Sequence, residues 1–164
     1  MNASSPQIYD APWGKALRWS SFGLVAFTAV ILSGLGYFGG LTQSVAAWAL
    51  PLFLLGCLPF VVRSYKIAGD ELLIRRLLWT TRLPLAGLKS AELIPRVMSY
   101  SLRICGNGGA FSFTGWFRNQ PLGYYRAFVT DLNRTVVLRF EKRTVVVSPA
   151  EPEDFVRHLA PQPS

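Results

Sequence analysis

The chain has 164 residues, of which 51% are hydrophobic and 16% charged, and it carries a net charge of +8 and a mean hydropathy of +0.29. A typical soluble domain is about 25% charged, so this composition excludes a wholly soluble chain of ordinary make-up. Two cysteines, Cys57 and Cys105, are too few for a disulfide framework, which excludes a small disulfide-stapled secreted domain.

The most apolar part of the chain runs from Trp19 to Val62 without a charged side chain. A helix needs roughly 20 apolar residues to cross a bilayer core, so this stretch is too long for one span and suits two. We therefore expect a transmembrane helical hairpin over residues 19–63, with a short uncharged connection at Gly39–Ser44. A cleaved signal peptide is the competing interpretation, but its apolar region is shorter and no second apolar segment follows it directly.

Basic residues on both sides of the apolar part indicate its orientation, because Lys and Arg near span ends stay on the cytoplasmic side. Tryptophan near a span end is typical of the membrane–water interface. The residues that set this topology are Lys15, Arg18, Trp19, Trp48, Arg63 and Lys66. Both termini and everything after the hairpin are thus expected in the cytoplasm. Since neither span contains an ionisable residue, we expect the hairpin to be an anchor rather than a transport pathway.

After the apolar part the sequence changes to a period of two, which indicates β-strands. Ala68-Gly69-Asp70 lies between two such runs and favours a tight β-hairpin turn. We expect about seven strands in meander order. The segments that carry this pattern are Ser64–Ile67, Glu71–Leu77, Thr80–Pro84, a strand reached through Leu85–Ile94, Leu102–Cys105, Phe111–Thr114, Tyr124–Thr130, Thr135–Phe140 and Thr144–Val147.

The end of the chain has the pattern of a short helix. Ser148-Pro149-Ala150-Glu151 has the S-x-x-E form of a capping box, with proline at the expected first helical position. Phe155, Val156 and Leu159 then form one apolar helical face. One terminal helix closing an antiparallel sheet is an α+β arrangement.

Several of these segments together carry a family resemblance. They are the strand pair Tyr65–Ile74 around its Gly-Asp turn, the glycine-rich Arg103–Gly109, and the closing Ser-Pro-x-x-Pro-x-x-Phe at residues 148–155. In this order they resemble the bacterial pleckstrin-homology (PH)-like domains of small bacterial membrane proteins, over roughly Ser64–Leu159. The resemblance implies a bent seven-stranded antiparallel β-barrel or sandwich capped by a C-terminal helix, and for most such proteins it implies no known biochemical activity.

The resemblance and the hairpin together give an expected organisation in a bacterial inner membrane. It consists of a cytoplasmic tail at residues 1–18, the hairpin at 19–63, the PH-like domain at 64–160 and a tail at 161–164. Some PH-like domains bind phosphoinositides through basic residues around the first hairpin loop. Here that loop is Ala68-Gly69-Asp70 and has no basic residue, so we do not expect that lipid site.

Catalytic chemistry has little support in the sequence. His158 is the only histidine, so no nucleophile has a base of its own and no Cys/His cluster has the spacing of metal ligands. The acidic residues at a turn and at the start of the final helix are explained by structure. We therefore expect no catalytic residue, no metal and no cofactor, and we do not expect an enzyme.

The segment from Gly106 to Tyr125 contains aromatic residues and arginines among glycines. Aromatics and arginine are enriched at protein interfaces, and aromatics also settle at the bilayer surface. The alternative interpretation is that these aromatics are core-facing strand residues around a tight bend. The residues that we expect to face a partner or the membrane are Trp116, Phe117, Arg118, Tyr124 and Arg126.

Two functional hypotheses follow. In the leading one, the domain is an interaction module that binds a protein partner or a second copy of itself. In the alternative, the basic domain binds anionic lipid headgroups, through Arg75, Arg76, Arg82 and Arg118. Nucleic acid is not expected as a partner, because the chain is tethered to a membrane and its basic residues form no long run.

Overall fold

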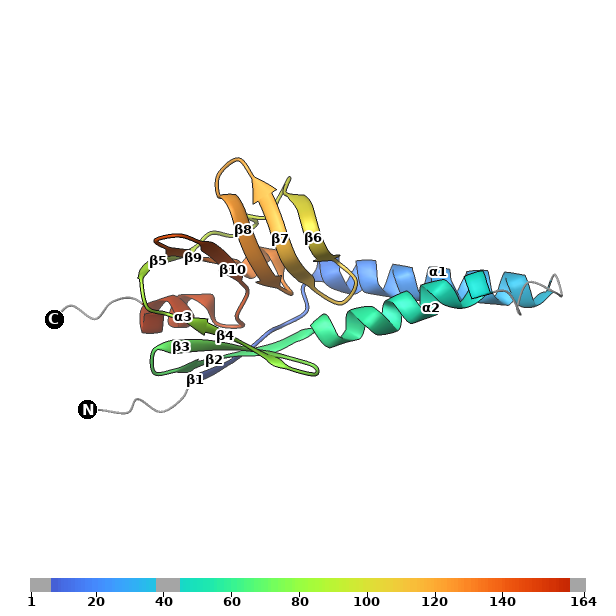
Figure 1. The fold of residues 1–164 in the computed structure, drawn as a ribbon, viewed down its shortest axis with the longest axis horizontal. Helices are drawn as coiled ribbons and strands as arrows, with labels where there is room; N and C mark the ends of the chain where they lie inside the picture. The colour runs from blue at the N-terminus through green and yellow to red at the C-terminus, as the bar shows by residue number, and fades with distance from the viewer. Residues whose placement is uncertain (1–6, 38–44, 160–164) are drawn as a thin grey trace.

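The computed structural model describes residues 7–37 and 45–159. Two β-sheets and a terminal helix form one β domain, from which two helices project side by side (Figure 1). These helices are α1 (Lys15–Tyr37) and α2 (Val45–Cys57), and a short 3₁₀ turn, η2 (Leu58–Phe60), leads from α2 back into the domain. Both helices leave the domain at the same end (Figure 1).

The first sheet has four antiparallel strands in the order β1-β2-β3-β4. Its members are β1 (Gln7–Asp10), β2 (Val62–Ala68), β3 (Glu71–Arg76) and β4 (Thr80–Pro84). The β4 bounds agree with the sequence prediction, and β2 and β3 differ from it by one or two residues.

The second sheet has six strands in the order β5-β9-β10-β8-β7-β6. The pair β8–β10 is parallel and the other pairs are antiparallel. Its members are β5 (Leu88–Leu93), β6 (Leu102–Gly108), β7 (Phe113–Asn119), β8 (Gly123–Val129), β9 (Val136–Phe140) and β10 (Thr144–Val147). A 3₁₀ turn, η3 (Leu132–Arg134), precedes β9, and the helix α3 (Pro152–Leu159) follows β10.

The α+β class is confirmed, but the expectation of about seven strands in meander order, all antiparallel, is wrong, and of the two expected forms the sheets do not make a barrel. The described residues contain ten strands, in two sheets that do not close on each other. One extra strand comes from the segment before the helices. β5, β6 and β7 overlap segments that the sequence predicted, but bulges and glycines in this region shift their bounds.

The central strands β9 and β10 of the six-stranded sheet are buried on both faces. Along β9, Val136 and Leu138 face the first sheet and α3, whereas Val137 lies between them and faces the other way. That second face is covered by the connection between β5 and β6, through Val97 and Met98. The continuous valine runs of β9 and β10 follow from this double burial, because a strand covered on both sides needs apolar residues at every position.

Within the segment expected to be a tail, residues 7–10 form β1 of the β domain, and Lys15 begins α1. β1 pairs with β2, with Tyr9 opposite Tyr65. The Tyr9 ring packs edge-on against Phe155 of α3, and its hydroxyl lies 2.9 Å from both Asp154 Oδ2 and His158 Nδ1. A strand of four residues is too short for a period of two to stand out, so β1 could not be predicted from local pattern.

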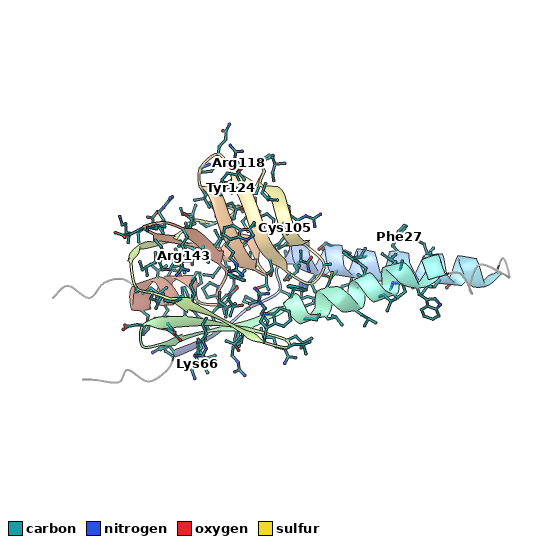
Figure 2. All side chains as sticks on the ribbon, viewed as in Figure 1. Phe27, Lys66, Cys105, Arg118, Tyr124 and Arg143 are labelled. Carbon is teal, nitrogen blue, oxygen red and sulfur yellow. The ribbon has the colours of Figure 1, made fainter. Side chains whose placement is uncertain are left out.

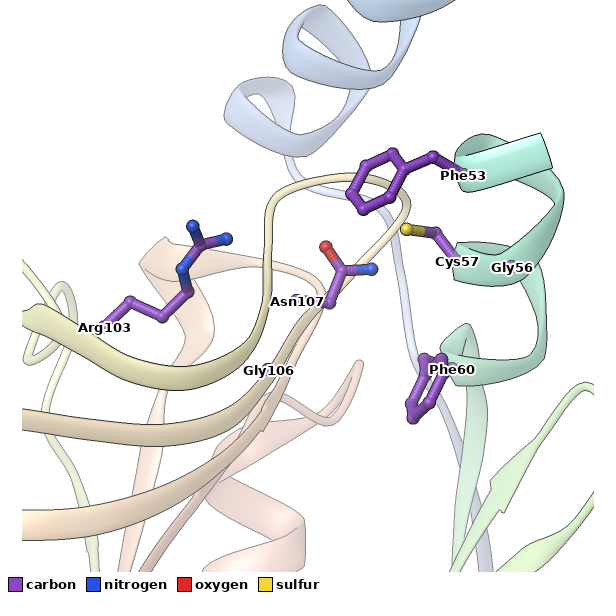
Figure 3. A pocket seen from close by; sticks show the side chains of 7 residues that line it. All are labelled: Phe53, Gly56, Cys57, Phe60, Arg103, Gly106 and Asn107. Carbon is purple, nitrogen blue, oxygen red and sulfur yellow. The ribbon is translucent and has the colours of Figure 1, made fainter. Parts of the chain in front are cut away.

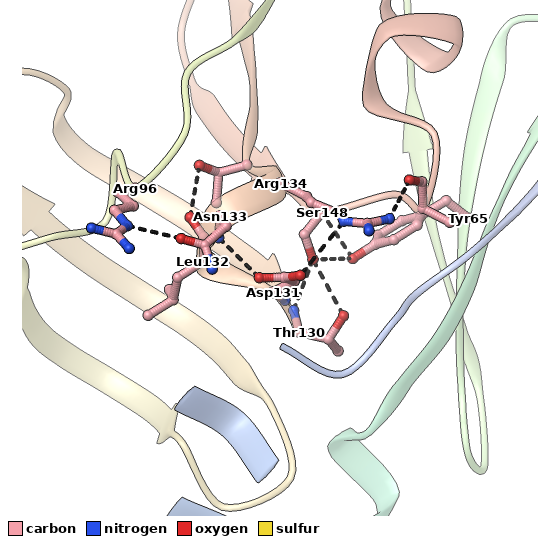
Figure 4. A network of polar contacts seen from close by, with 10 residues as sticks. Tyr65, Arg96, Thr130, Asp131, Leu132, Asn133, Arg134 and Ser148 are labelled. Atoms are coloured by element: carbon pink, nitrogen blue, oxygen red, sulfur yellow. Dashed lines mark hydrogen bonds and ion pairs between the residues drawn. The ribbon is translucent and has the colours of Figure 1, made fainter. Parts of the chain in front are cut away.

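Ser148 is not a helix cap, and the expected start at Pro149 is wrong. Its hydroxyl instead accepts hydrogen bonds from the backbone N–H groups of Thr130, at 2.8 Å, and Asp131, at 3.2 Å (Figure 4). Its own N–H donates to the hydroxyl of the fully buried Tyr65 at 3.2 Å. These bonds satisfy buried polar groups where the two sheets meet, and α3 begins only at Pro152.

Of the described helices, only α1 is long and apolar enough to span a membrane, over Lys15–Gly34 with a mean hydropathy of 1.5. α2 has 13 residues, fewer than a helix needs to cross a bilayer core, so the prediction of two full-length spanning helices is corrected to one among the described residues. The predicted connection Gly39–Ser44 lies outside the described residues. Both helices expose large apolar side chains, among them Phe22, Phe27, Leu52 and Phe53. Figure 2 shows Phe27 projecting outward from α1.

Candidate functional site

The glycine-rich turn between β6 and β7 is held against the base of α1 and against η2, which follows α2. Ser20 of α1 donates to the carbonyl of Gly109 at 2.8 Å, and the N–H of Phe111 donates to Ser21 Oγ at 3.0 Å. On the other side, Ser112 donates to the carbonyl of Phe60 at 3.1 Å. We call this contact the helix–domain junction. It fixes the helices relative to the six-stranded sheet.

Glycine is required where β6 and β7 face each other at this junction. Gly106 lies opposite Gly115, and their φ angles are +114° and +145°. A Cβ atom on Gly115 would lie 2.1 Å from the carbonyl oxygen of Cys105. The sequence suggested a loop from Gly106, but strand β6 continues to Gly108, and the backbones of β6 and β7 approach each other unusually closely here.

The turn between β3 and β4 adds exposed apolar residues to the same end of the domain. Leu77 donates its N–H to the carbonyl of Val61 at 3.1 Å, which ties the turn to the residue that follows η2. Leu78 at the tip is 71% exposed, and Trp79 is 41% exposed. Consecutive apolar residues at a turn were a signal in the sequence that our prediction of the site missed.

Arg76, at the end of β3, is a buried cation without an ionic partner. It is 8% exposed, and its Nε atom is buried with no hydrogen bond. Its guanidinium carbon lies 5.8 Å from the ring centre of Phe60, 5.5 Å from that of Trp79 and 4.9 Å from that of Phe128. Among the described residues, no carboxylate lies within ion-pair distance of it.

Arg126 of β8 extends this arrangement along the second sheet. Its guanidinium carbon lies 4.9 Å from the ring centre of Phe128 and 6.0 Å from that of Trp116, its cross-strand neighbour. Burial, and secondarily the positive charge of Arg126, lower the pKa of Arg76 to about 10. The resulting arginine–aromatic row consists of Phe60, Trp79, Arg76, Phe128, Arg126 and Trp116, and it joins the two sheets.

A pocket of about 310 Å³ lies between the last turns of α2 and the β6–β7 hairpin (Figure 3). Phe53, Cys57 and Phe60 face it from the helix side, and Asn107 faces it from the hairpin (Figure 3). Its lining is completed by Gly56, Arg103 and Gly106. Phe60 belongs both to this pocket and to the arginine–aromatic row, so the two adjoin.

A second exposed surface lies at the far end of β7 and β8, away from the helices (Figure 2). Here the Arg118 guanidinium lies 4.9 Å from the ring centre of Tyr124, which is 61% exposed. The neighbouring strand β6 is the outermost strand of this sheet among the described residues, and it exposes Leu102 and Ile104. With Trp116, these residues form the surface that we call the β6 edge.

The structure separates the residues that the sequence grouped as partner- or membrane-facing. Trp116, Arg118, Tyr124 and Arg126 are exposed. The prediction that Phe117 faces a partner or the membrane is wrong. It is 4% exposed and stacks on Tyr125 in the core, with 6.0 Å between ring centres. Because side chains of a strand alternate between faces, Phe117 had to face opposite to Trp116.

The four arginines expected to bind lipid together do not form one cluster. Arg75 and Arg82 are exposed on the outer face of the four-stranded sheet, whereas Arg76 points inward and Arg118 belongs to the other sheet. Of the expected topology residues, Lys15, Arg18, Trp19, Trp48 and Arg63 are exposed in or beside the helices, whereas Lys66 is half-buried farther along β2.

We next consider metal binding and the surroundings of His158. In the described part of the chain, no group of three or more His, Cys, Asp and Glu side chains is placed to hold a metal ion. His158 contacts Tyr9 and Asp154, and burial together with the Asp154 hydrogen bond raises the pKa of Tyr9 to about 12. A tyrosine that stays protonated here serves to attach β1 to α3.

A family model described as a bacterial PH domain matches residues 63–162. The match covers more than half of the chain and agrees with the resemblance seen in the sequence. Comparisons with curated proteins and with solved structures gave no match.

Proposed function

The chain belongs to the bacterial PH domain family, and from that premise we propose that it is a membrane-anchored, non-catalytic binding module. In this proposal α1 and α2 hold the β domain at the cytoplasmic surface of the bacterial inner membrane. The domain then presents the β6 edge to a protein partner or to a second copy of the chain. PH-like domains are generally binding modules rather than catalysts, which supports this class of function.

The observation that carries the anchor is the pairing of β1 with β2. β1 precedes α1 and β2 follows α2, yet both lie in one sheet. If α1 crosses the membrane, the chain must cross back before Val62, although α2 itself is short. α1 has 23 residues, which corresponds to about 35 Å of helix and exceeds a hydrocarbon core of about 30 Å.

The same pairing argues against a cleaved signal peptide. Removing α1 would also remove β1, whose Tyr9 is buried in the main core. Basic residues then agree with a cytoplasmic domain, because Lys15, Arg18 and Arg63 all lie where the helices meet the domain.

Thiol labelling tests this topology with a native probe. Cys105 is exposed and Cys57 is buried, so a membrane-impermeant maleimide should react with Cys105. We expect labelling in inverted inner-membrane vesicles and none in intact spheroplasts. A Cys105→Ser chain that also carries Ser44→Cys should give the reverse pattern. Labelling of Cys105 from outside would exclude the proposed topology.

The β6 edge supports a protein partner. An edge strand leaves backbone N–H and C=O groups free to pair with another strand. Aromatic and arginine side chains beside such an edge are the residue types that dominate protein interfaces. Trp116, Tyr124 and Arg118 provide them here, and exposed Leu102 and Ile104 add apolar area on β6 itself.

A further inference from the structure

The arginine–aromatic row has an unusual electrostatic composition. Two guanidinium groups, Arg76 and Arg126, each lie 4.9 Å from the Phe128 ring centre. Within residues 7–37 and 45–159 neither has an ion-pair partner, and Arg76 is more than nine-tenths buried with a free Nε donor. Aromatic faces compensate a cation only in part. An anion that reached both arginines would remove their repulsion and satisfy the free donor.

The surroundings of the row indicate what kind of anion fits. The adjoining pocket presents Phe53, Cys57 and Phe60 from α2 and η2, so an apolar chain could continue from the arginines along the helix (Figure 3). Asn107 and Arg103 contribute polar side chains to the hairpin side of the pocket. A small inorganic anion would leave this volume unused, whereas an amphipathic anion fills both parts.

The row also lies at the level where the helices leave the domain. Phe60 ends η2, and Trp79 belongs to the turn that hydrogen-bonds to Val61. The exposed Leu78 is at the tip of that turn. If the helices are in the bilayer, these apolar and aromatic residues lie at headgroup depth, where such side chains are favoured.

We propose that Arg76 and Arg126 bind the phosphate of an anionic phospholipid, whose apolar part lies in the pocket between α2 and the β6–β7 hairpin. This inference rests on the membrane anchoring proposed above. The site differs from the four-arginine set that the sequence suggested, because Arg75, Arg82 and Arg118 take no part in it. The lipid would also couple the two sheets to the helices, since the row connects all three.

Native mass spectrometry of the full-length chain in detergent tests the site, with phosphatidylglycerol titrated against phosphatidylcholine. We expect one phosphatidylglycerol to be retained in preference to phosphatidylcholine. Arg126→Gln should weaken its retention roughly tenfold or more, as expected for loss of a charge-assisted contact. Arg82→Gln, which removes an exposed arginine on the outer face of the other sheet, is the matched control and should retain lipid as the wild type does.

Two additions distinguish the source of the anion. Cys57→Trp should fill the pocket and lower lipid retention while both arginines remain. Inorganic phosphate and an oligoglutamate peptide should each displace phosphatidylglycerol poorly, because neither has an apolar chain. If inorganic phosphate displaced the bound lipid as well as free phosphatidylglycerol does, the site would be assigned to a free anion. If the peptide did so, the site would be assigned to a protein. Either result overturns the proposal.

Failure of the lipid site is separable from failure of the anchor. If the wild type does not discriminate between the two lipids, or if Arg82→Gln lowers retention as much as Arg126→Gln, the lipid site is excluded. Labelling of Cys105 from the cytoplasmic side would still support the anchor in that case. Loss of the expected labelling pattern would instead refute the anchor on which the site depends.

Discussion

Replacing Arg76 with methionine should make the lipid-free protein more stable rather than less. Burial and Arg126 lower the Arg76 pKa from the ordinary arginine value to about 10, and at about 1.4 kcal/mol per unit this corresponds to a penalty of about 3 kcal/mol. The penalty applies in full at neutral pH, because the side chain is charged there in both folded and unfolded states. Contacts with three aromatic rings offset about 2 kcal/mol of it.

Arg76→Met keeps most of the side-chain volume while removing the charge, so we expect a net gain of about 1 kcal/mol, or a rise in Tm of roughly 3 °C. The assay is thermal unfolding of the full-length chain in lipid-free detergent, followed by circular dichroism. Arg75→Met, on the exposed face of the same strand, is the control and should leave Tm nearly unchanged. A fall of several degrees for Arg76→Met would refute the view that Arg76 is an uncompensated cation.

Four further substitutions test the fold and the assigned burial. Gly115→Ala places a Cβ against backbone at a φ of +145°, so we expect a loss of about 3 kcal/mol or failure to accumulate in membranes. Tyr9→Phe removes the hydrogen bond that helps to lower the Asp154 pKa. In the wild type, the stability that depends on the ionised Asp154 carboxylate is lost as the pH falls through this lowered pKa. Urea titrations at decreasing pH should therefore show a smaller loss of unfolding free energy in the variant than in the wild type. Phe117→Ala should cost about 3–5 kcal/mol by opening a core cavity, whereas Trp116→Ala should change the unfolding free energy by less than about 1 kcal/mol, and equal effects in chemical denaturation would contradict the assigned burial.

Local sequence patterns predicted much of the β domain. Turn residues such as Gly69-Asp70 and regular alternation located β2 to β4, and the bounds of β4 and β10 were correct. These signals act over a few residues, so they do not say which strands pair. The division into two sheets, and the parallel pairing of β8 with β10, depend on contacts between distant segments.

The candidate sites were harder to predict, because charge and burial are separate properties. From the sequence, Arg75 and Arg76 were both predicted to bind lipid. In the structure Arg75 faces solvent, whereas Arg76 lies between the two sheets. Likewise, alternation showed that Trp116 and Phe117 face opposite ways but not which one faces the core. β1 was missed because four residues carry little pattern, and Ser148 was misread because its motif also occurs outside helix caps.

Photo-crosslinking from the β6 edge in native membranes tests the proposed binding function most directly. A photoreactive phenylalanine analogue at Trp116 of the full-length chain would be irradiated in membranes, and the adducts identified by mass spectrometry. The same analogue at Arg82, on the outer face of the other sheet, is the control. We predict a discrete protein adduct, either a partner or a second copy of the chain, from position 116 and none from position 82. Equal adducts from both positions, or no protein adduct from position 116, would contradict the assignment of the β6 edge as the binding surface.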